Sequence, residues 1–556
     1  MTEFHVVVLG TGAAGLTAAL AAHEAGASVG LYDRADRVGG TTAWSGGMVW
    51  IPNNHHMADV GVTDSREDAL RYLRAISLGT AEEALIESFV DQGPRVIRWL
   101  EDTTPVEFYT VERFPDYHPE VPGGKPQGGR SLECPPYEFA QLGAWADRVT
   151  VGYQMDFRST MNETPLGTWP TITPEEYARR VKEDLRAMGE SLAGRLLKGC
   201  LDRGIEPVTG ARARQLVCED GRVTGVRLEA AGGAVSEVHA RRGVVLACGG
   251  FEWDSELRRS FLRGPVDRPV SVPTNTGDGL RMAMQAGAAL ANMREAWWYP
   301  TVDLPVQGEL RPFQIMTHAG WPRCIVVNRA GRRFYNEATN YNASGAAFHF
   351  LDPTSYEYTN LPCWAVFDHE HLTRYGFSAV PGAMPTTDAA DSPDWLVSAP
   401  TVGELADRLG IDRQGLESTI ERWNRHCAKG ADPDFHRGVS AHDRWWGDPS
   451  FDRDTTTCTL GPLDTPPFHA AQVRPGILGT KGGPKTDPSG HVLDLDGNQI
   501  PGLFAAGNVM ASCTGSGYGG AGGTLGPAIV FGALAGAAAA KQQPANLLRL
   551  AATGDS

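Results

Sequence analysis

The pattern of apolar and polar positions is most regular over residues 4–47 of the 556-residue chain. Residues 6–9 form an apolar run with the length of a buried strand, and the alanine-rich residues 16–25 have helical composition. A second apolar run, residues 27–32, ends at Asp33. A glycine-rich turn joins the first run to the helix. This order predicts a strand–turn–helix–strand unit, the βαβ unit of parallel sheets.

Apolar spacing and turn residues predict the other elements in the same way. Helices are expected over residues 55–102, 173–205, 280–286 and, as a pair, 400–430, with a last apolar helix that reaches residue 540. Strands are expected over residues 324–337 (two strands around a turn), 361–368, 491–500 (a hairpin) and 502–508. Residues 212–250 predict two hairpins or a small meander that ends in a buried strand.

The glycine-rich character of the start of the chain returns near its end. Residues 1–290 and 467–556 both contain apolar strands that run into glycines, whereas the character changes over residues 291–466. We therefore expect an α/β fold with a discontinuous Rossmann-like domain, residues 1–290 and 467–556, and an inserted α+β substrate-binding cap, residues 291–466. The aromatic run 297–299 in the cap is either core packing or the wall of an apolar substrate pocket.

The first glycine turn has the spacing of a dinucleotide-binding fingerprint. Gly10 allows the tight turn, Gly12 lets the backbone approach a pyrophosphate at the positive end of the helix, and Gly15 lets the helix pack closely on the strand. Asp33 stands where a carboxylate accepts hydrogen bonds from a ribose. The contacts expected from this unit are Gly10, Gly12, Ala13, Ala14, Gly15 and Asp33.

Composition excludes several classes of protein. A formal net charge of -16, with no basic run or stripe, argues against a nucleic-acid partner. The nine cysteines include no CxxC pair, which predicts reduced thiols in the cytoplasm and neither a disulfide framework nor a zinc site. The first strand follows the initiating Met directly, so no signal peptide is expected. His55 and His56 are interpreted as surface or loop residues, and no metal is predicted.

Residues 503–540 form a long stretch without charge. The stretch exceeds the ~20 residues that span a bilayer. Glycine and alanine dominate it, however, and turn formers fill its first half. Such backbone would leave unsatisfied amides in lipid. We interpret it as a buried segment that lines a cofactor and expect no membrane span.

The loop after Asp33 favours a flavin over a nicotinamide. Its small residues leave room for a flat cofactor, and its hydroxyls can bond a phosphate or a ring edge. The loop resembles the flavoprotein family that includes fumarate reductase, succinate dehydrogenase and the 3-ketosteroid dehydrogenases, whose first lobe binds FAD. Members with covalent FAD carry a His in this loop. Residues 33–47 contain none, so the resemblance implies non-covalent FAD.

The resemblance extends the set of cofactor contacts. It brings the strand over residues 243–250 back to the first sheet, with its glycines passing the FAD. The last helix would point its N-terminal amides at the flavin. The further contacts implied are Gly40, Thr41, Thr42, Ser45, Gly46, Gly47, Gly249, Gly250, Asp278, Gly507, Asn508, Gly523 and Leu525.

The segment 515–527 indicates which members of the family are similar. The dicarboxylate enzymes carry an Arg there, whereas this chain has Tyr518 and no charge, which suits a neutral carbonyl. The chain resembles the 3-ketosteroid Δ1-dehydrogenases over its full length. The shared motifs are the N-terminal fingerprint through Gly47, Pro115-Asp116-Tyr117, Asn336-Glu337 with Tyr341, residues 479–483, residues 506–508 and residues 518–527. Residues 137–172 depart from the pattern, so the substrate stays open between a steroid and a smaller, cyclohexanone-type ring.

The resemblance implies desaturation of a cyclic ketone next to its carbonyl. The Tyr518 hydroxyl and the Gly522 backbone N–H would form an oxyanion hole for the enolate. Tyr341 would remove a proton from the adjacent carbon. A free tyrosine has a pKa near ~10, so Tyr117 would hydrogen-bond Tyr341 and either stabilise its phenolate or relay its proton. Flavin N5 would take the hydride from the next carbon.

Two other functions stay open at this point. One is the reverse direction, a fumarate-reductase-like reductase of an activated alkene. The other is a flavin-binding redox sensor or partner-binding module without catalysis. The expected substrate is a neutral cyclic ketone, and the external electron acceptor is a quinone or oxygen.

Overall fold

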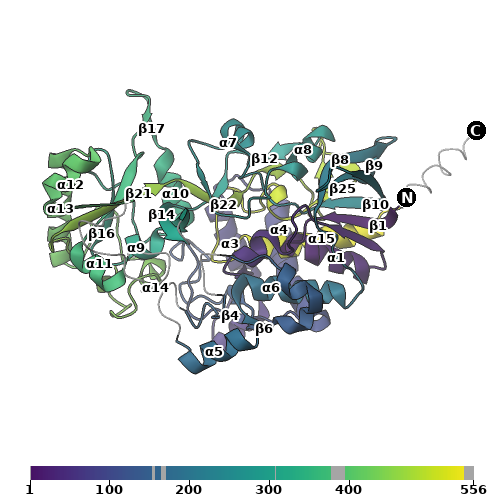
Figure 1. Ribbon diagram of the computed structural model, residues 1–556, viewed down its shortest axis with the longest axis horizontal. Helices are drawn as coiled ribbons and strands as arrows, with labels where there is room; N and C mark the ends of the chain where they lie inside the picture. The colour runs from purple at the N-terminus through teal and green to yellow at the C-terminus, as the bar shows by residue number, and fades with distance from the viewer. Residues whose placement is uncertain (1, 153–156, 165–170, 307–308, 377–394, 544–556) are drawn as a thin grey trace, which may run out of the picture.

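The computed structural model describes residues 2–152, 157–164, 171–306, 309–376 and 395–543. The molecule is elongated and has two lobes (Figure 1). The right-hand lobe contains the N-terminus and the last helix, and the left-hand lobe is built from the middle of the chain. Strands near the centre of the view join the two lobes.

A seven-stranded sheet forms the core of the first lobe. Its main path runs β2-β1-β10-β25-β24, that is Val29–Tyr32, Thr2–Leu9, Val235–Leu246, Gln499–Ala505 and His491–Leu493. β1 pairs in parallel with β2 and β10, and β10 pairs in parallel with β25. The predicted βαβ unit, the return of the strand before Gly249 and the hairpin near residue 500 are therefore confirmed. Parallel strands place their carboxyl ends at one edge, where a cofactor binds in such folds.

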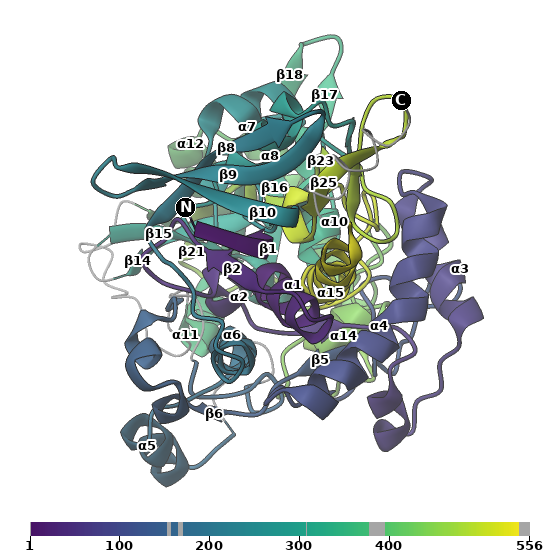
Figure 2. The same ribbon diagram turned by 90° about the vertical axis from the view of Figure 1, so that its right-hand side faces the viewer.

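Two helices made of small residues pack closely against this sheet. α1 (Ala13–Glu24) and α15 (Leu525–Lys541) run side by side (Figure 2). A Cβ on Gly532 would clash with the backbone of Ala14, and one on Gly536 would clash with that of Ala18. The uncharged stretch 503–540 is therefore a strand, a glycine-rich turn and a buried helix. Within the described residues, no helix is both long and apolar enough to cross a bilayer.

Gly536→Leu is expected to lower the free energy of unfolding by about 3 kcal/mol or more, because overpacking a close helix contact forces the backbones apart. The same change separates α1 from α15 and so disturbs the turn at Gly10 and Gly12. Chemical denaturation measures the loss of stability, and the flavin content of the purified protein measures the second effect. Lys541→Leu, exposed at the end of the same helix, is the control. Equal stability of the two variants would contradict the close packing.

The predicted meander is present beside β10. β8 (Ala211–Glu219) pairs antiparallel with β9 (Arg222–Ala230), and β9 pairs antiparallel with β10. Residues 55–102 are helical as predicted, in three pieces: η1 (His55–Val60), α3 (Arg66–Ser77) and α4 (Glu83–Thr103). The Ser65 side chain caps α3 by accepting a hydrogen bond from the Asp68 N–H.

The single helix predicted over residues 173–205 is wrong. The structure has α5 (Pro174–Lys182) and α6 (Met188–Leu201), separated by the short strand β7 (Leu185–Arg186). β7 pairs with β6 (Tyr137–Glu138). Asp184 and Met188 adopt φ of 49° and 51°, left-handed values that no helix interior allows. Tertiary pairing therefore overrides the helical composition of these residues.

A six-stranded sheet forms the second lobe. Its path is β15-β14-β21-β19-β16, with β20 on β21; the strands are Glu309–Gln314, Thr301–Val306, Phe468–Arg474, Cys363–Asp368, Cys324–Asn328 and Leu396–Ala399. The predicted helix pair covers one face as α12 (Val402–Leu409) and α13 (Arg413–Ala428). The sheet extends past the predicted cap boundary at residue 466, because β21 lies in its middle. The division into 1–290, 291–466 and 467–556 stays our prediction.

The second strand predicted within residues 324–337 is wrong. After β16, only an isolated bridge pairs Val327 with Arg333. The Arg333 guanidinium instead forms a buried ion pair with Glu337 at 2.6 Å and another with Asp432 at 2.9 Å. These charges fix the segment that leads to Tyr341.

Candidate active site

One long cavity of about 850 Å³ lies where the two lobes meet. The β1–α1 turn and the loop over residues 40–48 line one end. Tyr117, Tyr299, Tyr341 and Tyr518 line the other end. The cavity therefore joins the predicted dinucleotide site to the predicted tyrosines.

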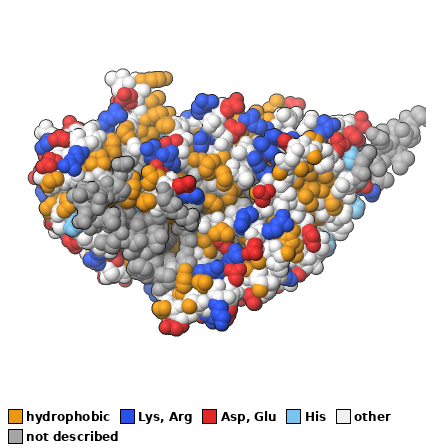
Figure 3. Space-filling model, viewed as in Figure 1, with side chains coloured by type: hydrophobic (Ala, Val, Ile, Leu, Met, Phe, Trp, Pro, Cys, Tyr) orange, Lys and Arg blue, Asp and Glu red, His pale blue; other side chains and the backbone are white. Residues whose placement is uncertain are grey.

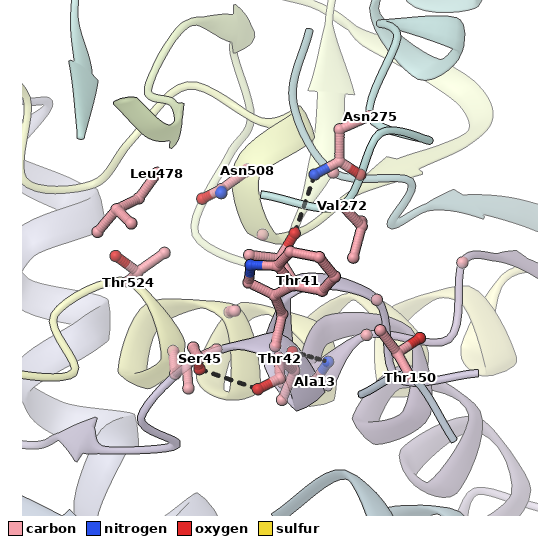
Figure 4. Close-up of a pocket in the computed structure, with 18 of the residues that line it drawn as sticks. Ala13, Thr41, Thr42, Ser45, Thr150, Val272, Asn275, Leu478, Asn508 and Thr524 are labelled. Carbon is pink, nitrogen blue, oxygen red and sulfur yellow. Dashed lines mark hydrogen bonds between the residues drawn. The ribbon is translucent and has the colours of Figure 1, made fainter. Parts of the chain in front are cut away.

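The β1–α1 turn can be built only with glycine. Gly10 has φ 114°, and a Cβ there would clash with the Ala247 carbonyl at the end of β10. A Cβ on Gly15 would clash with the Gly10 carbonyl, so Gly15 serves the close helix–strand packing. The Ala13 N–H donates to the Thr42 hydroxyl at 2.9 Å, which links the start of α1 to the loop over residues 40–48 (Figure 4).

Asp33 holds this turn in shape. Its Oδ2 accepts hydrogen bonds from the Thr11 N–H at 2.8 Å and from the Thr11 hydroxyl at 2.6 Å, and its Oδ1 accepts from the Ala35 N–H at 2.8 Å. Burial raises the pKa of Asp33, and these three bonds oppose that rise. A ribose hydroxyl at the predicted position would therefore bind to a carboxylate, that of Asp33, which already accepts three hydrogen bonds from the turn.

Asp278 is occupied by charge partners. Arg34 donates to its carboxylate at 3.0 Å, and Arg212 donates to it at 2.6 and 2.9 Å. Asp278 lines the cavity at the start of α8 (Asp278–Gln285), so the predicted helix after Gly277 is confirmed. Asp278 and its two arginine partners therefore lie at the end of the cavity formed by the β1–α1 turn, which we call the nucleotide end.

The middle of the cavity is lined by small and hydroxyl side chains (Figure 4). Asn275 Nδ2 donates to the Thr41 hydroxyl at 3.1 Å, and the Ser45 hydroxyl donates to the Thr42 carbonyl at 2.9 Å. Asn508 Oδ1 accepts from Trp297 Nε1 at 3.0 Å. A cavity lined by hydroxyl and amide groups, next to a glycine turn at a helix N-terminus, fits FAD.

Most of the predicted cofactor contacts line this one cavity. They are Gly10, Gly12, Ala13, Ala14, Asp33, Gly40, Thr41, Thr42, Ser45, Gly46, Gly47, Gly249, Asp278, Gly507, Asn508 and Leu525. Gly15, Gly250 and Gly523 lie behind the wall. A Cβ on Gly250 would clash with the Thr480 hydroxyl, and one on Gly523 would lie 2.9 Å from the Tyr518 ring. These three glycines act through packing.

The three predicted tyrosines form a hydrogen-bonded chain. The Tyr117 hydroxyl donates to that of Tyr341 at 2.9 Å, and the Tyr341 hydroxyl donates to that of Tyr518 at 3.0 Å. The Thr524 hydroxyl also donates to Tyr518, at 3.1 Å. Tyr117 and Tyr518 are 3% exposed and Tyr341 is 9% exposed, so water does not compete for these bonds.

Separate anchors hold each tyrosine. Asp116 accepts hydrogen bonds from Trp50 Nε1 at 2.8 Å and from the buried Arg130 at 2.7 Å, which fixes the long loop that carries Tyr117. Asn340 caps α10 (Tyr341–Ala346), and its Nδ2 donates to the Tyr117 carbonyl at 3.1 Å. The same residue therefore sets the positions of Tyr117 and Tyr341 together.

A buried lysine supports the third tyrosine. Lys481 Nζ donates to the carbonyls of Ser516 and Gly517 at 2.8 Å each, just before Tyr518. It also lies 4.3 Å from the centre of the Trp297 ring. Burial lowers the pKa of Lys481 to about 7. The sequence pattern indicated only a glycine-rich turn here.

Gly522 presents its backbone to the cavity. It has φ 97°, and its nearest neighbours are the backbone atoms of Met48 and Val49, with which a Cβ would clash. Its carbonyl accepts from the Trp50 N–H at 3.1 Å. No hydrogen-bond acceptor for its N–H is found among the described residues, so the amide can donate to a bound oxygen.

Burial favours the protonated form of these tyrosines. It raises the pKa of Tyr117 and Tyr341 well above the usual value for a phenol, and it also raises that of Tyr518. The hydrogen bonds that Tyr341 makes to its two neighbours raise its pKa further. The expectation that Tyr117 favours the Tyr341 phenolate is therefore opposed by this environment.

The structure also resolves the alternatives for the aromatic run. Tyr299 lines the cavity, and Trp297 packs on Tyr518 with ring centroids 4.6 Å apart. Trp298 is buried in a separate core cluster with Phe251 and Ile477. Both interpretations therefore hold, for different residues. Thr524 was not among the predicted site residues. Its place inside the glycine-rich run is the one sequence feature that points to a role in the site.

His55 and His56 are half-buried at the start of η1. Their Nε2 atoms lie 2.9 and 2.8 Å from the two carboxylate oxygens of Glu101. The three side chains are close enough to hold a metal ion. The absence of a metal from this protein stays a prediction.

Comparisons with known proteins agree with this geometry. The family model for the FAD binding domain matches residues 5–525. The 4-oxocyclohexanecarboxylate 2-dehydrogenase of Sinomonas cyclohexanicum is 40% identical over 97% of this chain and 93% of its own length. The 3-oxosteroid 1-dehydrogenase of Mycobacterium tuberculosis is 38% identical over 96% of this chain and 97% of its own.

A solved structure gives the same result for the fold. The 3-ketosteroid delta1-dehydrogenase of Sterolibacterium denitrificans, in complex with 1,4-androstadiene-3,17-dione, matches with a TM-score of 0.88 and 32% identity. The match covers 97% of this chain and 100% of that one. The chain therefore belongs to the FAD-binding domain family, as a flavin-dependent oxidoreductase related to the 3-oxosteroid 1-dehydrogenases.

Proposed function

We propose that the protein is an FAD-dependent dehydrogenase that introduces a C=C bond next to the carbonyl of a neutral cyclic ketone. The observation that carries the proposal is the buried chain of hydroxyls from Tyr117 through Tyr341 to Tyr518, beside the Gly522 amide, at one end of the cofactor cavity. Relatives named for ketosteroid and oxocyclohexanecarboxylate dehydrogenation support it.

The Tyr518 hydroxyl polarises the substrate carbonyl. Its oxygen already accepts hydrogen bonds from Tyr341 and Thr524, so its own O–H points elsewhere and is available as a donor. The Gly522 N–H supplies the second donor. Two donors fixed in a buried site stabilise the enolate oxygen more than they stabilise the neutral carbonyl.

The phenolate form of Tyr341 takes the proton from the carbon next to the carbonyl and becomes the neutral phenol that donates to Tyr518. Its oxygen lies between the hydroxyls of Tyr117 and Tyr518, so the base and the oxyanion donor are fixed relative to each other. Tyr117 continues to donate to the Tyr341 oxygen while the proton moves. The residues of the β1–α1 turn and of the loop 40–48 would hold FAD, which would supply the hydride acceptor for the following carbon; a quinone or oxygen would serve as the external electron acceptor.

The charges of the cavity support a neutral substrate. Among its described lining residues, the carboxyl and guanidinium side chains are Asp33, Arg34, Asp36, Arg37 and Asp278, all at or next to the nucleotide end. The tyrosine end offers no described cation to a carboxylate. On the face in Figure 3, positive and negative side chains are interspersed, which does not favour a nucleic acid.

A product assay tests the proposal. The purified protein is incubated with cyclohexanone-type and 3-oxosteroid ketones and an artificial electron acceptor, and products are identified by mass spectrometry. The expected product is the enone, lighter than the ketone by two hydrogens. Complete recovery of every ketone, with fully loaded FAD, would overturn the proposal.

The raised pKa of Tyr341 predicts a rate that increases with pH. A base with a raised pKa is mostly protonated below that pKa, so its active fraction grows up to tenfold per pH unit. We expect kcat/KM to rise from about pH 6 to about pH 9 without a plateau. Initial rates in buffers of constant ionic strength measure this. A profile that falls above pH 7 would contradict a phenol as the base.

We also propose that FAD is bound without a covalent link and that the protein is cytoplasmic. The cavity has no His among its described lining residues, which supports the first statement. None of the nine cysteines is in a disulfide, which supports the second. Acid precipitation is expected to leave the yellow colour in the supernatant. Colour that stays with the protein pellet would show a covalent link.

A further inference from the structure

An amide donor without a partner lies beside the catalytic tyrosines. The Tyr299 hydroxyl donates to Gln314 Oε1 at 3.2 Å, which holds the Gln314 side chain in place. The other end of this amide, Nε2, is buried and has no hydrogen-bond partner among the residues that the structure describes. Both residues line the cavity. A buried donor without an acceptor lowers the stability of the folded protein. A donor of this kind in the wall of a cavity therefore indicates a ligand that supplies the acceptor.

Gln314 is linked to the catalytic tyrosines through Tyr299. The Tyr299 and Tyr341 rings pack edge to face with centroids 5.2 Å apart, while the Tyr299 hydroxyl donates to Gln314. Contacts therefore run from the base through Tyr299 to the amide, which is separate from the two donors proposed for the reacting carbonyl. Gln314 comes from β15, an element of the second lobe that contributes none of the residues proposed for catalysis.

The part of the cavity beside the tyrosines is otherwise lined by apolar side chains. Val270, Leu478, Met161 and Trp446 line the same cavity, and Val270, Met161 and Trp446 belong to the buried cluster that contains the tyrosines. An ionised carboxylate would therefore lose its hydration there without meeting a described cation. A ketone, ester or hydroxyl oxygen needs only the one donor that Gln314 offers.

We propose that the substrate carries a second, neutral oxygen at the end of its ring system remote from the reacting carbonyl, and that Gln314 Nε2 donates a hydrogen bond to it. This inference rests on the proposed desaturation of cyclic ketones. Gln314 then selects substrates, since a site built to bond an oxygen discriminates against an analogue that lacks it. Tyr299 is a positioning residue for this amide.

The test compares ketones that differ only at the remote oxygen. One pair is androst-4-ene-3,17-dione and androst-4-en-3-one, and a second pair is 4-acetylcyclohexanone and 4-isopropylcyclohexanone. In the native protein we expect at least one pair to show a KM about 10-fold or more lower for the member with the extra oxygen. The pair that shows the difference also reports the size of the substrate.

Gln314→Met removes the donor and keeps the length of the side chain. Its expected effect is to bring the KM ratio of that pair close to one. Tyr299→Phe is expected to reduce the ratio partly, because the amide loses its anchor. Gln215→Met, on the exposed part of β8, is the matched control and keeps the ratio of the native protein.

Several results would overturn the inference. They are a ratio near one in the native protein for both pairs, an unchanged ratio in Gln314→Met, and equal changes of both KM values, which would show a purely structural role. A lower KM for 4-oxocyclohexanecarboxylate than for 4-acetylcyclohexanone would reject the neutral oxygen. If the native protein desaturates none of these ketones, the proposed function itself fails and the inference fails with it.

Discussion

Replacing Tyr341 by Phe is expected to lower kcat for ketone desaturation by about 10³-fold, within the usual range for loss of a general base. The change removes the only atom that takes the proton and leaves the ring in its buried position. The Tyr117 and Tyr518 hydroxyls lose their shared partner, so a small loss of stability accompanies the loss of rate. Flavin content should stay at the native level, because Tyr341 enters the cavity from α10 of the second lobe.

Single-turnover and steady-state rates with one ketone measure the effect. Tyr335→Phe is the matched control, since Tyr335 is equally buried but belongs to the core of the second lobe, outside the cavity. The pH dependence of kcat/KM should also disappear in Tyr341→Phe. A rate within a few-fold of the native rate would remove Tyr341 as the base.

Replacing Tyr518 by Phe should lower kcat by about 10²- to 10³-fold, as for the loss of one oxyanion donor. KM should change little, because the donor acts mainly on the charge that develops on the oxygen. Comparison of kcat and KM for the same ketone measures this split. A rise in KM with unchanged kcat would show that Tyr518 only binds the ground state.

Thr524→Val is a second variant whose loss of kcat should be smaller than that of Tyr518→Phe. The Thr524 hydroxyl donates to the Tyr518 oxygen at 3.1 Å and does not reach the substrate in the proposed arrangement. Its removal should weaken Tyr518 as a donor and lower kcat by about tenfold at most. A larger loss of kcat in Thr524→Val than in Tyr518→Phe would contradict the proposal that Thr524 acts through Tyr518.

Local pattern was enough to predict the nucleotide half of the molecule. The apolar runs before Gly10 and before Asp33 are strands of the parallel sheet, and the glycines stand where backbones meet. The strand–turn–helix–strand order is set by residues close together in the chain, which a sequence pattern records. The tyrosine roles came from family resemblance, because Tyr117, Tyr341 and Tyr518 are brought together only by the tertiary fold.

The errors have a common physical cause in distant contacts. Residues 183–187 are not helical because β7 pairs with β6, and Arg333 forms ion pairs with Glu337 and Asp432 where a second strand was predicted. Gln314 and Lys481 gave no signal, since an amide in a strand and a lysine in a glycine-rich turn are usually exposed. Their burial beside the cavity is a property of the assembled fold.

The most direct test of the central claim is anaerobic mixing of the FAD-loaded protein with a panel of cyclic ketones. The account predicts that at least one ketone bleaches the absorbance of the oxidised flavin, with one enone formed for each flavin bleached. It also predicts that Tyr341→Phe, with the same flavin content, bleaches about 10³-fold more slowly. Bleaching by dithionite but by none of the ketones would contradict the account.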